Sequence, residues 1–452
     1  MTTIDERFAA GKALRREVPR SSHGHFIRDD SFDAVDLVLS QEKGRLEDLI
    51  PVRRARMAES PFAFFRAGAQ LMASDLASTP RTDIPVQASG DAHLANFGWY
   101  GSPERDLVFD VNDFDETLQA GWEWDLKRLA ASFVIASQDN GFDEKDQRKA
   151  ARTAARSYQK AMMSYASRPV LEAWYDRISA DEILERLRSE GRSRDLQRAE
   201  KGFRKASRKD SRHVLGKLAE RVDGRYRIID DPPFVVPIRS MDFPTDADRV
   251  RALILETIDR YTDTVAPAIV MLIRKFRVID MALKVVGVGS VGTRTFIAML
   301  EGNDEEDVLF LQIKEAGRSV LEDEFGDSPL AHPGQRIVEG QRLMQTVSDI
   351  MLGWTTTHTG NQYYVRQLKD MKASADIGKF DPGDMREYAR VCGRVLAHAH
   401  ARSGDSAVIS GYIGSSARFS HAVTDFAAAY AEQNERDYRA FIERMRAESL
   451  TS

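Results

Sequence analysis

A short loop that combines an aspartate, a histidine and an asparagine, followed by a strand that ends in acids, constrains this chain most. The loop reads Gly90-Asp-Ala-His-Leu-Ala-Asn96, and the strand leads into Asp110-Val-Asn-Asp-Phe-Asp-Glu116. Taking an ionisable side chain out of water costs several kcal/mol unless the group is paired or binds a metal. Because so many ionisable groups gather in one region, the pattern predicts a functional site.

The length and composition indicate a globular protein with two lobes or domains. The chain has 452 residues, which exceeds what a single core usually organises. Hydrophobic residues make up 42% of it, and the net charge of -5 is mild, so nothing global indicates a nucleic acid or an anionic membrane as partner. The single cysteine, Cys392, excludes an intrachain disulfide and fits a reducing compartment.

The sequence also argues against a membrane location. The longest nearly uninterrupted apolar run, Val265 to Ile273, has about half the length that a bilayer span requires. Arg15 and Arg16 form a twin arginine, but no apolar stretch follows it as in an export signal. We therefore expect a cytoplasmic protein.

A glycine-rich segment between apolar strands predicts a second part of the site. Gly287-Val-Gly-Ser-Val-Gly292 fits the GxGxxG template, which two unrelated kinds of nucleotide site share. In a dinucleotide-binding fold the third glycine opens a helix, whereas here the β-branched run Thr293 to Met299 leads to a turn and another strand. The segment favours the hairpin that covers the phosphates of ATP in kinases, with a purely structural hairpin as the alternative. The expected nucleotide contacts are Gly287, Gly289, Ser290 and Gly292, and Arg294 can add a phosphate contact.

In kinases, the strand after this hairpin carries a lysine for the α and β phosphates, and the next helix carries its glutamate partner. Lys314 ends the apolar strand that begins at Val308. A helix is expected from about Gly334 to Leu352, and Glu339 lies at the edge of its apolar stripe. Glu339 is therefore the expected partner of Lys314, with two competitors, Glu322 and Glu324.

The same chemistry needs a base for the acceptor hydroxyl and ligands for Mg²⁺. Asp91 and Asn96 stand five residues apart, as the catalytic Asp and Asn of kinases do. Asp113 precedes Phe114 in the position of the metal-binding Asp-Phe dipeptide, and Asp110 is a rival ligand. Magnesium keeps several waters, so one amide and one or two carboxylates suffice. A solvated acidic turn or a calcium loop is the alternative.

Three segments resemble aminoglycoside phosphotransferases and related small-molecule kinases. Gly90 to Asn96 resembles their catalytic loop, with Ser89 where they usually have His. Asp125-Leu-Lys-Arg-Leu-Ala130 looks like their downstream Asp-Leu-Ala helix start, and Val395-Leu-Ala-His-Ala-His-Ala401 like the helix before their catalytic loop. The resemblance implies an α+β, bilobal protein-kinase-like fold that uses ATP and Mg²⁺, with a small-molecule hydroxyl as the favoured acceptor.

Over essentially its whole length, the chain also looks like a bacterial family catalogued as domain of unknown function 2252. The residues that carry this match are Pro51-Val-Arg-Arg-Ala-Arg-Met57 with Ser60-Pro-Phe62, Val285 to Arg294, and Tyr364 to Asp370. This second resemblance brings no established activity with it.

The order of the motifs departs from ordinary kinases, because Asp91 precedes Gly287 by nearly two hundred residues. Either the kinase analogy is accidental, or the lobes are circularly permuted, which proteins tolerate where joints fall in exposed segments. We predict permutation. The expected parts are a helical extension (1–80), a large-lobe catalytic segment (81–275), a small β-rich nucleotide lobe (276–372) and C-terminal helices that complete the large lobe (373–452).

The expected reaction is transfer of the γ-phosphoryl group of ATP to a hydroxyl acceptor. Two alternatives stay open: AMP transfer from a reversed ATP, and a non-enzymatic nucleotide-binding or sensing protein. A nucleic-acid partner is not expected, because acids interrupt the basic run from Arg192 to Lys217 and aromatic residues are few.

Four further residues receive structural interpretations. His93 is expected to brace the loop through a hydrogen bond to backbone or a carboxylate. His398 and His400 lie on different faces of one helix, so a metal pair is not expected. Cys392 continues an apolar stripe and is expected to be buried.

Overall fold

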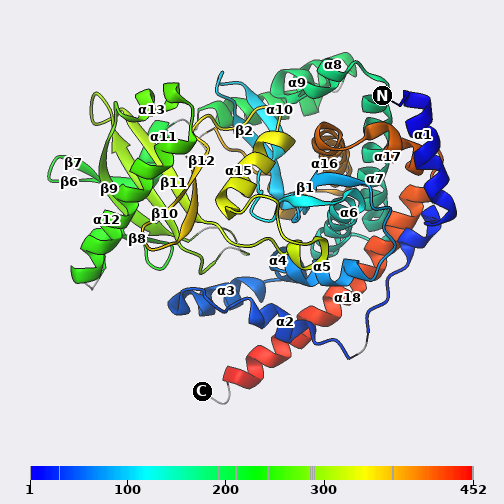
Figure 1. Ribbon diagram of the computed structural model, residues 1–452, viewed down its shortest axis with the longest axis horizontal. Helices are drawn as coiled ribbons and strands as arrows, with labels where there is room; N and C mark the ends of the chain where they lie inside the picture. The colour runs from blue at the N-terminus through cyan, green and yellow to red at the C-terminus, as the bar shows by residue number, and fades with distance from the viewer. Residues whose placement is uncertain are drawn as a thin grey trace.

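The computed structural model describes residues 2–29, 31–191, 193–208, 211–241, 244–285, 287, 289, 291–368 and 371–449. The protein is a mixed α+β protein, as the sequence predicts. Figure 1 shows a sheet with its own helices at one end and a body of long helices at the other.

The helical body is built around α6 (Trp122–Asp139), which is buried on nearly all sides. Because its charged residues are buried together with its apolar ones, they must find partners inside the protein. Around it pack α7 (Glu144–Ser167), α16 (Pro382–Ser403), α17 (Ser406–Ile413) and α18 (Arg418–Ser449), as Figure 1 shows. Helical periodicity in the sequence predicts helices over 123–137 and from 384 onward, and the structure confirms both. Cys392 is fully buried in this core, as expected.

Short strands beside α6 position the loop 90–96. β1 (Pro85–Ala88) pairs with β4 (Leu118–Gly121), and β2 (Phe97–Gly101) pairs with β3 (Leu107–Val111), both antiparallel. β3 also pairs with β5 (Ile178–Ser179). The loop between β1 and β2 and the acidic segment between β3 and β4 therefore leave the same group of strands, which confirms the predicted strands around the loop.

The second sheet is antiparallel and has the strand order β12-β13-β11-β10-β9-β8. The glycine-rich segment joins β9 to β10 as a hairpin, so it is followed by a strand, as the sequence predicts. α15 (Pro333–Met344) connects the middle of the sheet to its edge. The strands are β8 (Val235–Pro237), β9 (Arg277–Lys284), β10 (Thr295–Glu301), β11 (Val308–Glu315), β12 (Gly353–Thr356) and β13 (Gln362–Gln367).

Residues before position 276, the predicted start of the nucleotide lobe, also pack with this sheet. β8 forms its edge, and α12 (Pro244–Tyr261) and α13 (Pro267–Ile273) pack on one face. α11 (Ser211–Leu218) contributes to a core cluster on the other face. Segment 211–275, which the sequence division places with the catalytic segment, therefore packs with the sheet.

One helix is shorter than its periodicity predicts. Helical periodicity in the sequence predicts a helix over 195–222. The structure has two helices there, α10 (Ser193–Ser207) and α11, and the second ends at Leu218, where β6 (Ala219–Val222) begins and pairs with β7 (Arg225–Ile228). Asp223 and Gly224 both have positive φ angles, 52° and 80°. Such a pair closes a two-residue hairpin turn, which overrides the helical pattern before it.

The N-terminal segment wraps from the helical body to the sheet. It contains α2 (Ala34–Ser40), α3 (Ile50–Met57), α4 (Pro61–Ala67) and α5 (Ala69–Ala77), so the predicted helical region is helical in four short pieces. In Figure 1, α3 extends beneath the sheet. The remaining helices are α1 (Ile4–Ala13), α8 (Val170–Trp174), α9 (Ala180–Ser189), α10 (Ser193–Ser207) and α14 (Glu322–Phe325).

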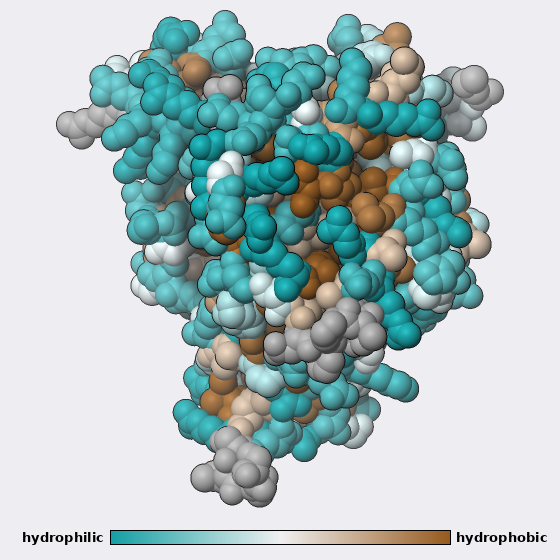
Figure 2. Space-filling view, turned by 90° about the vertical axis from the view of Figure 1, so that its left-hand side faces the viewer, coloured by the Kyte–Doolittle hydropathy of each residue, from teal (hydrophilic) through white to brown (hydrophobic). Residues whose placement is uncertain are grey.

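The surface at the sheet end is partly apolar. Figure 2 shows an apolar area surrounded by hydrophilic residues on this side of the molecule. Leu255 on α12 and Met271 on α13 are exposed. Within the described ranges, no helix combines the length and the apolar composition that crossing a membrane requires.

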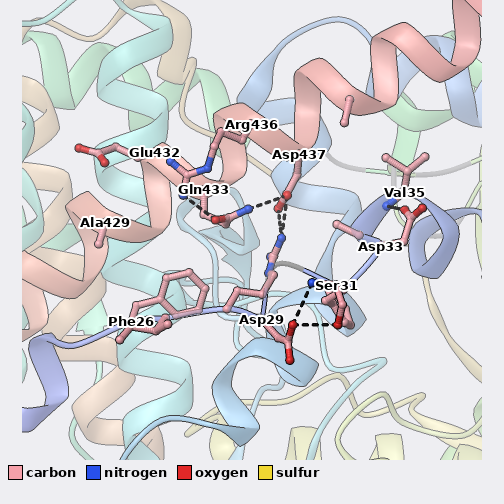
Figure 3. Close-up of a pocket in the computed structure, with 15 residues that line it drawn as sticks. Phe26, Asp29, Ser31, Asp33, Val35, Ala429, Glu432, Gln433, Arg436 and Asp437 are labelled. Atoms are coloured by element: carbon pink, nitrogen blue, oxygen red, sulfur yellow. Dashed lines mark hydrogen bonds and ion pairs between the residues drawn. The ribbon is translucent and has the colours of Figure 1, made fainter.

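A buried ionic clasp fixes the N-terminal segment to α18. Arg28 donates from Nε to Asp75 (2.6 Å) and from Nη1 to Asp437 (2.6 Å). The hydroxyl of Tyr430 donates to Asp75 at 2.9 Å. Figure 3 shows Asp437 on α18 also joined to Gln433, beside a hollow of about 760 Å³. The hollow lies at this clasp, and no residue of the loop 90–96 lines it.

Removing Arg28 should destabilise the protein strongly, because Asp75 and Asp437 would remain buried without their counter-ion. We expect Arg28→Met to lower the free energy of unfolding by about 3–5 kcal/mol in urea denaturation. The exposed pair of Arg148 with Asp425 is the control, and Arg148→Met should cost less than about 1 kcal/mol. Similar losses in the two variants would contradict this account of the clasp.

His23 should make the protein sensitive to acid. It is fully buried, 2.7 Å from the Tyr412 hydroxyl, and burial, assisted by Lys127, lowers its pKa from 6.5 to about 3. Below pH 6.5, His23 binds a proton in the unfolded chain, whereas in the folded chain it stays neutral down to about pH 3. The free energy of unfolding therefore falls as the pH falls through this window.

The contribution of His23 is up to about 1.4 kcal/mol per pH unit below its unfolded pKa. His23→Gln should therefore show a shallower loss of unfolding free energy than the wild type between about pH 6.5 and 4.5. Urea titrations of both proteins at several pH values measure the two slopes. Equal slopes would show that His23 is not the group responsible.

Candidate functional site

The loop after β1 is anchored by a buried carboxylate at the start of α6. Asp125 accepts hydrogen bonds from the backbone N–H of Ser89 (2.6 Å) and of Gly90 (3.0 Å). Its Oδ2 also lies 3.1 Å from Nε2 of His400 on α16, and Nδ1 of that ring lies 2.9 Å from the Tyr158 hydroxyl. Helices from distant parts of the chain therefore fix one loop. His398 bonds elsewhere, to the carbonyl of Ala173, so the two histidines form no metal pair.

Gly90 is required where the loop meets the acidic segment. Its φ is +78°, and a Cβ would lie 2.4 Å from the carbonyl oxygen of Glu116. Any other residue would clash with backbone and adopt an unfavourable conformation. The glycine thus lets the loop and the acidic segment touch.

Asp91 is oriented from two sides. Nε of Arg128 donates to Oδ1 of Asp91 at 2.6 Å, and the amide of Asn96 donates to the Asp91 carbonyl (2.8 Å) and to Oδ2 (3.3 Å). About 20% of the Asp91 side chain is exposed, so one side of the carboxylate faces open space. Burial raises the pKa of Asp91 to about 6 against the opposing effect of Arg128, and Asp113 raises it further.

His93 lies beside Asp91 without a close hydrogen bond to it. Its Nε2 is 3.7 Å from the carboxylate, and its buried Nδ1 has no partner among the described residues. Burial lowers the pKa of His93 well below its ordinary value, so the ring is neutral. The expected hydrogen bond to backbone or carboxylate is therefore absent from the described contacts, and the ring packs edge-on against Phe62.

Lys314 meets the acidic segment directly. Its Nζ lies 2.6 Å from Oδ2 of Asp115, whose other oxygen accepts a 2.7 Å hydrogen bond from Tyr364. Burial opposes the charge of Lys314, but Asp115 and Tyr364 raise its pKa above the ordinary value. A strand lysine and an acidic turn far apart in the sequence are thus joined in one buried pair.

The partner of Lys314 differs from the expected Glu339. Glu339 pairs with Arg342 at 3.1 Å and is 43% exposed, whereas Lys314 pairs with Asp115. α15 instead contributes Arg336, which donates to the carbonyls of Thr117 (2.5 Å) and Asp115 (2.9 Å). The two competitors, Glu322 and Glu324, do not pair with Lys314 either: Glu322 lies near Arg318 and Arg336.

Two cavities lie on either side of the acidic segment. The larger, about 790 Å³, has basic and polar walls that include Lys314, Arg366, Lys372 and Ser374. The smaller, about 260 Å³, holds Asp91, His93, Asp115, Glu116 and Glu315 together with Arg45. Burial raises the pKa of Glu116 to about 7, although its carboxylate accepts a hydrogen bond from the N–H of Val320.

Four residues line both cavities and mark their junction: Arg66, Asn96, Asp113 and Gly287. Three of the four are residues that the sequence singles out. The structure therefore brings the loop, the acidic segment and the glycine-rich hairpin to one place.

The other predicted residues take different positions. Gly289 lines the smaller cavity, whereas Gly292, with a φ of +90°, packs on Arg45. Arg294 pairs with Glu315 at 3.1 Å and lines neither cavity. Asp110 is buried in β3, where its Oδ1 accepts a 2.8 Å bond from the N–H of Val111, and it also lines neither cavity. Ser290 lies outside the described residues.

The N-terminal segment holds the glycine-rich hairpin. Arg45 donates to the carbonyl of Val291 at 2.5 Å, and the N–H of Leu46 donates to the carbonyl of Gly292 at 2.8 Å. Arg56 donates to the carbonyl of Gly287. These contacts were not predicted from the sequence, which indicated a helical extension over residues 1–80. The cluster of arginines from Arg53 to Arg56 was the available signal.

The donor set fits a metal that is shared with phosphate. No group of three or more His, Cys, Asp or Glu side chains forms a metal cage within the described ranges. Asn96 and Asp113 offer one amide and one carboxylate at the junction, and magnesium often takes few protein ligands and completes its shell with water and phosphate. The basic walls of the larger cavity suit the phosphates.

Comparison with known proteins gives one match. A family model described as an uncharacterized protein conserved in bacteria (DUF2252) matches residues 45–444. No curated protein and no solved structure matches the chain. The matched region contains the junction residues and the strands and helices that position them.

The pair of Lys314 with Asp115 should show strong energetic coupling. Either Lys314→Met or Asp115→Asn leaves its partner buried without its counter-ion, so each should lower the unfolding free energy by about 2–4 kcal/mol. The double variant should cost less than the sum of the two, by about 1–3 kcal/mol. Urea denaturation of the four proteins measures this cycle, and additive losses would contradict the pairing.

Proposed function

The chain belongs to the bacterial family DUF2252, and we propose that it is an ATP- and Mg²⁺-dependent phosphotransferase with a protein-kinase-like fold in circularly permuted order. The observation that carries the proposal is the junction of two cavities at Asn96, Asp113 and Gly287. On one side the walls suit a nucleotide, and on the other Asp91 is available to an acceptor.

The order of elements supports the permuted fold. The sheet runs from a glycine-rich hairpin through the lysine strand β11 and helix α15 to β12 and β13, which is the order expected of a nucleotide lobe. α16 follows, and its His400 contacts Asp125, 275 residues away in the sequence, beside the catalytic loop. A helix expected just before that loop in an ordinary kinase thus lies against it in space.

The larger cavity is assigned to ATP. Its volume of about 790 Å³ lies within the range of ordinary small-ligand sites. Lys314, Arg366 and Lys372 provide positive charge for the phosphates, and half-buried Ile377 and Tyr388 add an apolar wall. Asn96 and Asp113 would hold Mg²⁺, which supplies charge neutralisation on the phosphate oxygens.

The smaller cavity is assigned to the acceptor. The acceptor hydroxyl donates a hydrogen bond to Asp91, which Arg128 and Asn96 hold in place. The acceptor oxygen forms a bond to the γ-phosphorus while the bond from that phosphorus to the β,γ-bridging oxygen breaks. ADP leaves with the bonding electron pair, and the hydroxyl proton passes to Asp91. A hydroxyl-bearing small molecule matches the volume of about 260 Å³.

Nucleotide binding is the first test. MgATP is titrated by calorimetry into the wild type, Asp113→Asn, Lys314→Met and Glu339→Gln. Asp113→Asn and Lys314→Met should each weaken binding by at least about tenfold, which corresponds to about 1.4 kcal/mol. Glu339→Gln is the matched control and should bind within about twofold of the wild type, because Glu339 lies outside both cavities.

Product analysis identifies the group that is transferred. Prolonged incubation with MgATP, with water or a hydroxyl compound as acceptor, should give ADP in phosphorus NMR spectra. Formation of AMP and pyrophosphate would support AMP transfer instead. Binding without any turnover would favour a nucleotide sensor, and no binding at millimolar MgATP would refute the assignment of the cavity.

A further inference from the structure

We propose that Arg66, from the N-terminal segment, binds the phosphoryl group as it passes between the two cavities. This inference rests on the proposed phosphotransferase function and adds a catalytic residue from outside the predicted nucleotide and catalytic segments. Arg66 lies in the last turn of α4 and lines both cavities at their junction.

The state of the Arg66 side chain points to an anionic ligand. Its Nε is buried without a hydrogen-bond partner, and none of the contacts given for the described residues pairs its guanidinium with a carboxylate. A buried donor without a partner is costly. Other arginines around the site have hydrogen-bonded partners: Arg128 binds Asp91, Arg45 binds the carbonyl of Val291, and Arg336 binds backbone carbonyls through both Nη atoms, although its Nε, like that of Arg66, has none. Arg66 thus has no hydrogen-bonded counter-ion among the described residues, while the charges of Asp91, Glu59 and Asp113 favour its positive form.

The position of Arg66 is coupled to that of the base. Nη2 of Arg128 donates to the carbonyl of Phe65 at 3.2 Å, and its guanidinium lies over the Phe65 ring. The same Arg128 donates to Asp91. At its other end, α4 is capped by Ser60, whose oxygen accepts from the N–H of Ala63 at 3.2 Å. One arginine therefore holds both the base and the helix turn that carries Arg66.

The chemistry of guanidinium selects phosphate. Its planar, forked donors match two oxygens of one phosphoryl group, and it stays charged even though burial lowers the pKa of Arg66. During transfer, negative charge is spread over the equatorial oxygens of the phosphoryl group, which lie between donor and acceptor. A cation that reaches both cavities can contact those oxygens before and after the bond to the bridging oxygen breaks. An arginine in this role raises kcat by about 10³–10⁵ in GTPases.

The test compares ligands with and without the terminal phosphate. Dissociation constants for MgATP, MgADP and magnesium tripolyphosphate are measured for the wild type, Arg66→Gln and Arg66→Lys, together with the rate of ADP formation. Arg439→Gln is the matched control, because Arg439 lies on the surface of α18, is 72% exposed and, among the described residues, pairs with Glu435. Retained MgADP affinity shows that a variant is folded around its site.

Arg66→Gln should weaken MgATP and tripolyphosphate by about tenfold, leave MgADP within about twofold, and slow ADP formation by at least about 100-fold. Arg66→Lys should recover part of the ATP preference, and Arg439→Gln should match the wild type. Equal effects of Arg66→Gln on MgATP and MgADP, or no effect on either, would overturn the role of Arg66. If the wild type binds tripolyphosphate through Arg66 but no nucleotide, the phosphotransferase proposal fails and the anion site stands. If it binds neither ligand, both proposals fail.

Discussion

The buried carboxylate of Asp125 is the contact on which the site depends. It accepts the N–H groups of Ser89 and Gly90 and meets His400, so it satisfies the backbone of a sharp loop that water cannot reach. Its position in the first turn of α6 also places negative charge where the helix dipole favours it. Because Asp91 follows Gly90 directly, the direction of the proposed base is set by this anchor.

Guanidinium groups hold the rest of the site together. Arg336 ties α15 to the backbone of the acidic segment, Arg128 ties α6 to Asp91 and α4, and Arg45 ties the N-terminal segment to the glycine-rich hairpin. Each of these arginines donates to a backbone carbonyl from a distant part of the chain. A backbone carbonyl has no titratable charge. These contacts therefore fix the geometry of the site without adding an acidic group to it. The cavity walls are therefore organised by the protein itself before any ligand binds.

The sequence predicts local features of this fold better than pairings across it. The strands around the loop, the hairpin after β9 and the buried α6 follow from periodicity and glycine placement, and the structure confirms them. The pairing of Lys314 with Asp115 spans 199 residues and leaves no local signal. The order of elements along the chain predicts Glu339 as the partner of Lys314. The α15 side chain that contacts the acidic segment is Arg336 instead. Arg66 gives no local signal either, because its position between two cavities and the missing hydrogen bond of its Nε among the described residues arise only in the folded chain.

The balance of charge explains why a segment outside the predicted lobes completes the site. Asp91 and Asp113 place negative charge where the proposed reaction also brings phosphate, so cations must offset both. Asp115 already neutralises Lys314, and Asp91 already engages Arg128. The strand lysine that would serve the phosphates in an ordinary kinase is thus partly committed to the protein. Arg366 and Lys372 add positive charge in the larger cavity, and at the junction itself α4 brings Arg66 from the N-terminal side. In this arrangement, the N-terminal segment is as much a wall of the candidate site as the glycine-rich hairpin that it holds.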